Sequence, residues 1–148
     1  MAPLITLLAA SLAARIVGWL GVDYMDSWVK AIAVGLAAMF VLTGVAHFVP
    51  PLRGSLIAIV PPQLPAPGLL VGITGVLELL GAVGLLVPAT RIAAAACLLV
   101  LMLAMFPANI YAARMPNPPE SMTTQLPLRT AEEIVYLAAA VMVAIGGS

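Results

Sequence analysis

The chain has very few charged residues. Lys and Arg number six, Asp and Glu number six, and together they make up 8% of 148 residues. Soluble domains carry about a quarter charged residues, so this shortage excludes a water-soluble globular protein. The net charge of zero leaves no basic surface that would indicate nucleic acid as a partner. Hydrophobic residues make up 64% of the chain and its mean hydropathy is +1.17, which indicates the lipid bilayer as its surroundings.

Cysteine and histidine occur once each. Cys97 cannot form a disulfide within the chain, and no CxxC motif is present for thiol–disulfide chemistry, so we interpret Cys97 as a packing residue. With His47 as the single histidine, haem ligation by two histidines of one chain is excluded, and so is a zinc site of the usual His/Cys type. We therefore predict no metal site and no intrinsic cofactor.

Long apolar segments occupy most of the chain. One crossing of a bilayer takes about 20 residues, so 148 residues leave room for four or five helices and no soluble domain. A cleaved signal peptide is not expected, because no basic residue precedes the first apolar run and Arg15 interrupts it. We predict an all-α transmembrane bundle forming a single domain over residues 1–148, with helices at about 4–21, 29–49, 68–88, 91–113 and 128–145.

Residues 50–67 contain six of the prolines, in the string PPLRGSLIAIVPPQLPAP. Proline lacks the backbone N–H and clashes with the preceding helical turn, so this segment cannot form one continuous helix. The stretch SLIAIV between the proline pairs is too short to cross a bilayer. We therefore predict an interfacial loop over residues 50–67, in which SLIAIV forms an interfacial or re-entrant turn.

Glu78 lies at the middle of the apolar run from Gly68 to Pro88 and is its only ionisable residue. A carboxylate at that depth costs about 3 kcal/mol on insertion scales, so such residues face a partner, a cavity or a ligand. Two interpretations follow: a structural hydrogen bond within the bundle, or an acid that handles a proton or ligand. Small residues at helical spacing around Glu78 place it on a face that packs against another helix.

Several polar residues should meet at one side of the membrane. With an odd number of crossings, the helix ends near residues 47, 109 and 129 lie on the same side, and Glu78 lies about 15 Å below them at 1.5 Å per residue. We predict a polar mouth with Glu78 at its floor. The alternative is that these are ordinary residues at headgroup level. The candidates for the mouth are His47, Arg53, Glu78, Asn109, Arg129 and Glu133.

Arg15 is the second ionisable residue deep in an apolar segment. At 1.5 Å per residue it lies about 16 Å from the same surface, which matches the depth of Glu78. The two could form an intramembrane ion pair, in which each supplies the other's counter-charge. In the alternative, Arg15 extends towards the opposite face, and Glu78 is protonated and bonds to His47, Thr43 or a ligand.

Five strings occur in the order found in a known family. The chain resembles the DoxX-like family of small bacterial membrane proteins over about residues 30–136. The resemblance implies a four-helix membrane bundle, with the family's His, Glu, Asn and Arg at His47, Glu78, Asn109 and Arg129. The strings are GVAHF (44–48), VPPQLPAP (60–67), GVLELLGAVGLLVPATR (75–91), FPANI (106–110) and LPLR (126–129).

The chain departs from that family at two places. The segment Met1 to Val22 is an addition to the usual four helices, and Glu133 stands where many relatives have Gln. The family is related to the small subunit of thiosulfate:quinone oxidoreductase, and other relatives are associated with membrane redox complexes. The resemblance therefore implies a multi-pass protein of the bacterial plasma membrane.

Two functions follow as hypotheses. The first is an accessory or structural subunit of a membrane redox or respiratory assembly, which contacts a quinone or lipid through the polar mouth. Its partners would be other membrane subunits or further copies of the chain. Whether it is an enzyme is left open, because no catalytic or redox centre is recognised. The alternative is a transporter of a small solute or proton, with Glu78 in its path.

Overall fold

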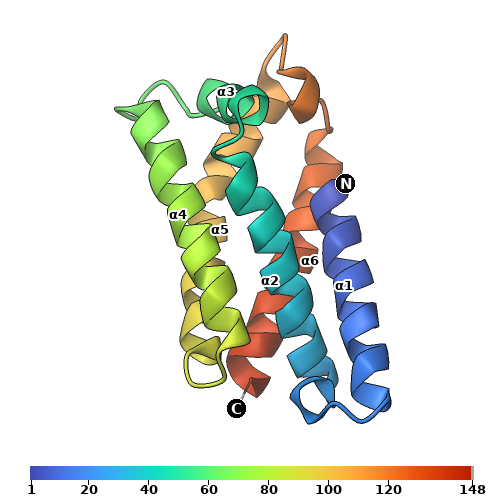
Figure 1. The fold of residues 1–148 in the computed structure, drawn as a ribbon. Coiled ribbons are helices and arrows are strands. Elements are labelled where there is room, and N and C mark those ends of the chain that lie inside the picture. The colour runs from blue at the N-terminus through green and yellow to red at the C-terminus, as the bar shows by residue number, and fades with distance from the viewer. Residues whose placement is uncertain (148) are drawn as a thin grey trace.

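The computed structural model describes residues 1–147, which form helices and connecting turns without a β-strand (Figure 1). Two short 3₁₀ turns, η1 (Asp23–Met25) and η2 (Glu120–Met122), lie in connections. The α-helices are α1 (Ala2–Trp19), α2 (Trp28–Ala46), α3 (Pro50–Ala58), α4 (Pro67–Leu86), α5 (Arg91–Arg114) and α6 (Leu126–Gly146).

Proline and a serine cap set several helix starts. Pro occupies at least one of the first two positions of α1, α3, α4 and α6, where its missing N–H costs no helical hydrogen bond. At α2 the Ser27 hydroxyl accepts a hydrogen bond from the Lys30 backbone N–H at 3.3 Å, which satisfies one of the free N–H groups at the helix start.

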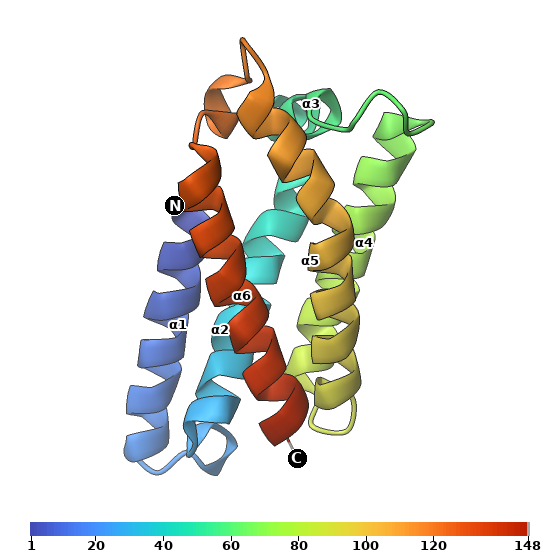
Figure 2. The same cartoon turned by 180° about the vertical axis from the view of Figure 1, so that it is seen from behind.

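The long helices form an antiparallel bundle with α2 at its centre. α2 contacts α1, α4 and α6, while α5 contacts α4 and α6. Figures 1 and 2 show α3, η2 and the N-terminus at one end, here called the upper end, and η1 and the α4–α5 turn at the lower end. The predicted architecture is confirmed: α2, α4, α5 and α6 form a four-helix core, and α1 is an added N-terminal helix packed on α2.

Close contact between α1 and α2 depends on glycine. A Cβ added at Gly35 would lie 1.9 Å from the Ser11 hydroxyl oxygen and 2.7 Å from the Leu7 carbonyl oxygen. Only a residue without a side chain allows the two backbones to approach this closely, as is common between helices in membranes. The added helix is therefore fitted closely against the core bundle.

Four helices, α1, α2, α4 and α5, are long and apolar enough to cross a membrane. We predicted five crossings, and α6 was the fifth. α6 is long enough, with 21 residues, but Arg129, Glu132 and Glu133 near its start make it too polar to count with the other four. Those residues lie largely inside the bundle: Glu133 is 9% exposed and the Glu132 side chain 12%. The chain is thus a multi-pass helical bundle in which α6 turns its charges inward.

The proline-rich segment differs from the predicted loop. Residues 50–58 form α3, which begins with Pro50 and Pro51 at its first positions. Proline at a helix start is compatible with a helix, whereas proline inside one is not. The prediction of a loop was wrong for this half of the segment, and the remaining residues 59–66 connect α3 to α4 without a helix. α3 lies across the upper end of the bundle (Figure 1).

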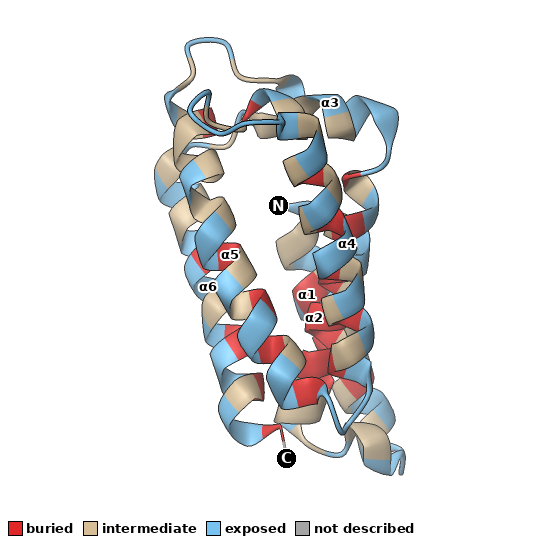
Figure 3. Ribbon diagram, turned by 90° about the vertical axis from the view of Figure 1, so that its left-hand side faces the viewer, coloured by how far each residue is buried: buried red, intermediate tan, exposed pale blue. Residues whose placement is uncertain are grey.

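Buried residues are most concentrated in the lower half of the bundle (Figure 3). The largest side chains that are fully buried are Leu36, Leu85, Leu98 and Val143. Gly81 admits Leu98 between α4 and α5, since a Cβ there would lie 2.4 Å from a Leu98 methyl carbon. The apolar core therefore fills the lower half of the bundle, where Arg91 is one of the few buried polar residues.

Arg15 does not reach Glu78, so the predicted ion pair is wrong. The Arg15 guanidinium carbon lies 4.8 Å from the ring centre of Trp19 and 5.7 Å from that of Trp28. α2 stands between α1 and α4 (Figure 1), so matching depth does not bring the two side chains together. Arg15 instead extends to the lower end, where the faces of the two tryptophan rings attract its positive charge.

Candidate functional site

A polar cavity lies under α3 and η2 at the upper end of the bundle. Its volume is about 280 Å³. Side chains of α2, α4, α5 and α6 supply most of its wall, and apolar residues such as Met39, Phe40 and Met102 lie lowest in it. The polar side chains that line it are Thr43, His47, Glu78, Asn109, Ser121, Thr124, Arg129, Glu132, Glu133 and Tyr136.

Five of the six residues predicted for the mouth line this one cavity. They come from four helices: His47 closes α2, Glu78 lies within α4, Asn109 within α5, and Arg129 and Glu133 near the start of α6. The order of the crossings brought these helix ends together, as expected from the sequence.

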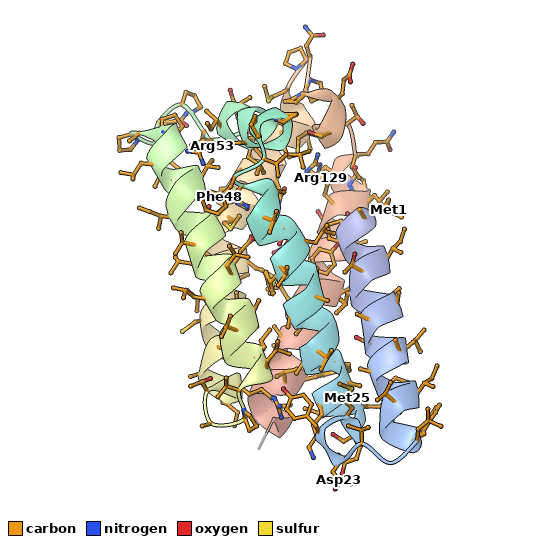
Figure 4. The ribbon with its side chains drawn as sticks, viewed as in Figure 1. Met1, Asp23, Met25, Phe48, Arg53 and Arg129 are labelled. Atoms are coloured by element: carbon orange, nitrogen blue, oxygen red, sulfur yellow. The ribbon has the colours of Figure 1, made fainter. Side chains whose placement is uncertain are left out.

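Arg53 is the residue that lies outside the cavity lining. Its guanidinium donates hydrogen bonds to the His47 carbonyl oxygen at 2.9 Å and to the Gly68 carbonyl oxygen at 2.8 Å. Arg53 therefore joins α3 to the end of α2 and the start of α4. Figure 4 labels it above Phe48, at the upper end of those helices. Its role is to hold the helices that carry His47 and Glu78.

The ring of His47 is held in one orientation. Its Nδ1 lies 2.8 Å from the Thr43 carbonyl oxygen, and because a carbonyl only accepts, Nδ1 carries the proton. The same atom lies 3.7 Å from Glu78 Oε2, beyond hydrogen-bond distance. Burial lowers the pKa of His47, just past the end of α2, and the charge of Arg53 lowers it further, while the bond to Thr43 opposes both. The neutral ring leaves Nε2 as an acceptor.

Gly75 provides the space in which His47 lies. A Cβ added at Gly75 would lie 2.5 Å from His47 Cβ and 2.9 Å from His47 Cγ. No contact of this length is tolerated, so any larger residue must push His47 and the end of α2 away from α4. Gly44 does the same on α2, where an added Cβ would lie 2.9 Å from the Leu79 side chain.

We expect Gly75→Ala to lower the free energy of unfolding by about 1–3 kcal/mol, the usual cost of overpacking. The matched control is Gly54→Ala in α3, where an added Cβ meets nothing within 4 Å. This control should stabilise by about 0.5–1 kcal/mol, because alanine is the better helix residue. Thermal unfolding of both variants in detergent measures the difference. Equal melting temperatures would contradict the close fit of His47 on Gly75.

Arg129 ties the η2 connection over the cavity. It donates to the Thr124 carbonyl at 2.8 Å, to the Met122 carbonyl at 2.6 Å and to the Asn109 side-chain oxygen at 3.2 Å. All three acceptors belong to the protein, so the hydrogen bonds of the Arg129 guanidinium hold the η2 connection in place. Figure 4 shows Arg129 at the start of α6, below η2.

Two buried carboxylates in the cavity each have one oxygen without a hydrogen-bond partner. Glu78 is 5% exposed and Glu133 is 9% exposed, and Glu78 Oε2 and Glu133 Oε1 each accept no hydrogen bond. Glu132 Oε1 also accepts no hydrogen bond, but the positively charged amino group of Met1 lies 3.1 Å from it and forms an ion pair with it. A buried polar atom without a partner costs about 1–3 kcal/mol. The cavity thus presents acceptor atoms that a hydrogen-bond donor would satisfy.

A second, apolar cavity of about 530 Å³ adjoins the first. It lies between the upper halves of α4 and α5, below residues 59–64, and His47, Leu56 and Met105 line both cavities. Leu56 and Met105 were missed by sequence analysis. They carry no polar atom that would separate them from other apolar residues of the helices, so no signal in the sequence could have identified them.

Among the described residues, no group of three His, Cys, Asp or Glu side chains is placed to hold a metal ion. The side chains of the site can form hydrogen bonds and exchange protons. Its free atoms are the two carboxylate oxygens and the Nε2 atom of neutral His47. All three are acceptors of hydrogen bonds or of protons.

The chain matches a known protein family over most of its length. Residues 36–145 match the model of a family described as a domain of unknown function, DUF8561. The match covers the four core helices from the middle of α2 onwards and leaves out α1. No curated protein and no solved structure matches the chain.

Proposed function

Because the chain belongs to the DUF8561 family, whose function is unknown, we propose a role from its own geometry. The protein is an accessory subunit of a membrane redox assembly, and it holds the head group of a quinone in the polar cavity. It binds the reduced form, the quinol, in preference to the oxidised form. One observation carries this proposal: two unpartnered, buried carboxylate oxygens share a cavity with a neutral histidine and an apolar floor.

The free atoms of the cavity match a quinol. A quinol has two hydroxyl donors on a flat apolar ring, whereas a quinone has only carbonyl acceptors. Glu78 and Glu133, when ionised, can only accept hydrogen bonds. Hydrogen bonds to charged groups contribute about 1.5–3 kcal/mol, so two such bonds favour the donor form. Phe40 and Met39 supply an apolar surface for the ring.

The same groups can receive protons. Oxidation of a quinol to a quinone breaks two O–H bonds and releases two protons and two electrons. The carboxylates of Glu78 and Glu133 would take the protons. The electrons would pass to a redox group of a partner subunit. The resemblance to the DoxX-like family, with its relatives in membrane redox complexes, supports such a partner and a place in the bacterial plasma membrane.

The first test compares the two redox forms directly. The protein in lipid nanodiscs should bind a short-tailed ubiquinol analogue about a hundredfold tighter than the corresponding quinone, since two charge-assisted hydrogen bonds, each contributing about tenfold, differ between them. Calorimetry under anaerobic conditions measures both affinities. The control is Glu120→Gln, at an exposed acid outside the cavity, which should leave them unchanged. Equal affinities, or tighter binding of the quinone, would overturn the proposal.

The second test addresses the accessory role. Extraction of the tagged protein in mild detergent should yield complexes that contain a subunit with a flavin, haem or iron–sulfur group. Purification as an isolated chain at native expression level would contradict that part of the proposal. Uptake of a solute by liposomes that contain this chain alone would favour the alternative of a transporter with Glu78 in its path.

A further inference from the structure

The apolar cavity between α4 and α5 has the shape and lining of a hydrocarbon site. Its volume is about 530 Å³. Thr74 is one of its few polar residues, and the Thr74 hydroxyl already donates within α4, to the carbonyls of Leu70 and Val71 at 3.0 and 3.1 Å. The apolar side chains around it include Leu56, Ile59, Leu64, Val71, Leu101 and Met105.

This cavity shares part of its wall with the polar cavity. Leu56, Met105 and His47 line both. The His47 ring is held by the Thr43 carbonyl, while leucine and methionine side chains change rotamer readily, methionine most of all. A chain leaving the polar cavity between Leu56 and Met105 would enter the apolar one directly. Towards η2 the lining of the polar cavity includes Ser121, Thr124 and Arg129, which are polar.

We propose that the apolar cavity binds the isoprenoid tail of the quinol whose head group lies in the polar cavity. This inference rests on the proposed function and names the part of the ligand that sets its affinity. The tail of a membrane quinone is insoluble in water and must leave the head-group site through apolar surroundings. The continuity of the two cavities at Leu56 and Met105 provides that route, so the ligand enters sideways from the bilayer between α4 and α5.

Ala104 and Ala108 allow the tail site to be filled without touching the head-group site. Both line the apolar cavity and neither lines the polar one. A phenylalanine at either position would project into the open volume that the tail occupies. Ala96 is the matched control, because it is an exposed alanine of the same helix and lines neither cavity.

The experiment measures the affinity gained from a tail. A tailless quinol and a decyl quinol are titrated into nanodiscs that contain the wild type, Ala104→Phe, Ala108→Phe or Ala96→Phe. In the wild type and in Ala96→Phe the decyl compound should bind at least tenfold tighter. In Ala104→Phe or Ala108→Phe this gain should fall at least fivefold, while the affinity for the tailless compound and the melting temperature stay unchanged.

Each failure has a distinct result. If the tailless compound binds but both cavity-filling variants keep the full gain from the tail, the tail site is wrong and the proposed function stands. If the wild type binds neither compound, the proposed function fails and the tail site fails with it. A variant that lowers the affinity for the tailless compound as well would place the head group in the apolar cavity and overturn the two-part site.

Discussion

Glutamine at both Glu78 and Glu133 is expected to weaken the binding of a short-tailed quinol about a hundredfold. A hydrogen bond to an ionised acceptor contributes about 1.5–3 kcal/mol and one to a neutral acceptor about 0.5–1.5 kcal/mol. Each substitution therefore removes about 1.4 kcal/mol, which corresponds to tenfold in affinity. Each also removes a proton acceptor. Calorimetric titration of the single and double variants measures the effects separately and together.

Stability should change in the opposite sense to binding. Glutamine has nearly the same shape as glutamate and carries no charge, so it avoids the cost of a buried, unpartnered carboxylate. The melting temperature of the double variant should equal or exceed that of the wild type, because residues that serve function often lower the stability of the fold. Quinol affinity unchanged in the double variant would show that neither carboxylate contacts the ligand.

Leucine at Arg91 is expected to lower the free energy of unfolding by about 3 kcal/mol. Arg91 is 3% exposed, and its Nε donates to the Leu85 carbonyl at 3.0 Å. Its guanidinium lies over the Tyr24 ring at 5.3 Å, and the Tyr24 hydroxyl donates to the Leu86 carbonyl. A hydrogen bond from a charged group contributes about 1.5–3 kcal/mol, and a desolvated cation over an aromatic ring about 2 kcal/mol.

Thermal unfolding in detergent measures this loss as a fall of roughly 6–12 °C, at about 2–4 °C per kcal/mol for chains of this size. Arg91→Lys keeps the charge and should fall in between. The control is Lys30→Met, at the solvent-exposed pair with Asp26, where Lys30 Nζ and Asp26 Oδ1 lie 2.8 Å apart. Such a pair contributes about 0.3–0.5 kcal/mol. If Arg91→Leu had the same melting temperature as Lys30→Met, Arg91 would not stabilise the lower end of the bundle.

The fold could be predicted from sequence because lipid permits few structures. Shortage of charge and long apolar runs indicate membrane helices, and backbone groups in lipid must bond within their own helix. The cavity residues could be predicted for a related reason. Helices that alternate in direction place every second connection on the same side of the bundle. The order of the helices alone therefore predicts that His47, Asn109 and Arg129 lie at the same end.

The predictions for Arg15 and Arg53 failed because the position of a residue along a helix does not determine towards which neighbour its side chain points. Arg15 and Glu78 have similar depths, but depth gives no information on which helix stands between them. Arg53 was correctly placed at the upper end, yet its side chain turns to the carbonyls of His47 and Gly68. Such a choice depends on where free acceptors lie, which only the packed structure determines.

The abundance of proline in residues 50–67 led to the wrong prediction of a loop where α3 forms. The position of each proline matters more than the number of prolines. Pro50 and Pro51 stand at the helix start, and the next proline follows only after nine further residues. The apolar cavity was beyond prediction for another reason. A void is produced by shape, and the side chains around it are the same types that fill the lower core.

The uneven packing of the bundle has a consequence for its motions. Leu36, Leu85, Leu98 and Val143 lock the lower half, whereas the upper half holds voids of about 280 and 530 Å³. Local opening takes least free energy where few apolar contacts must break. Backbone amides of α3 and η2 should therefore exchange their hydrogens with solvent while those around Leu85 stay protected. The lower half then stays folded while the upper half opens locally, so that the upper half can open without global unfolding.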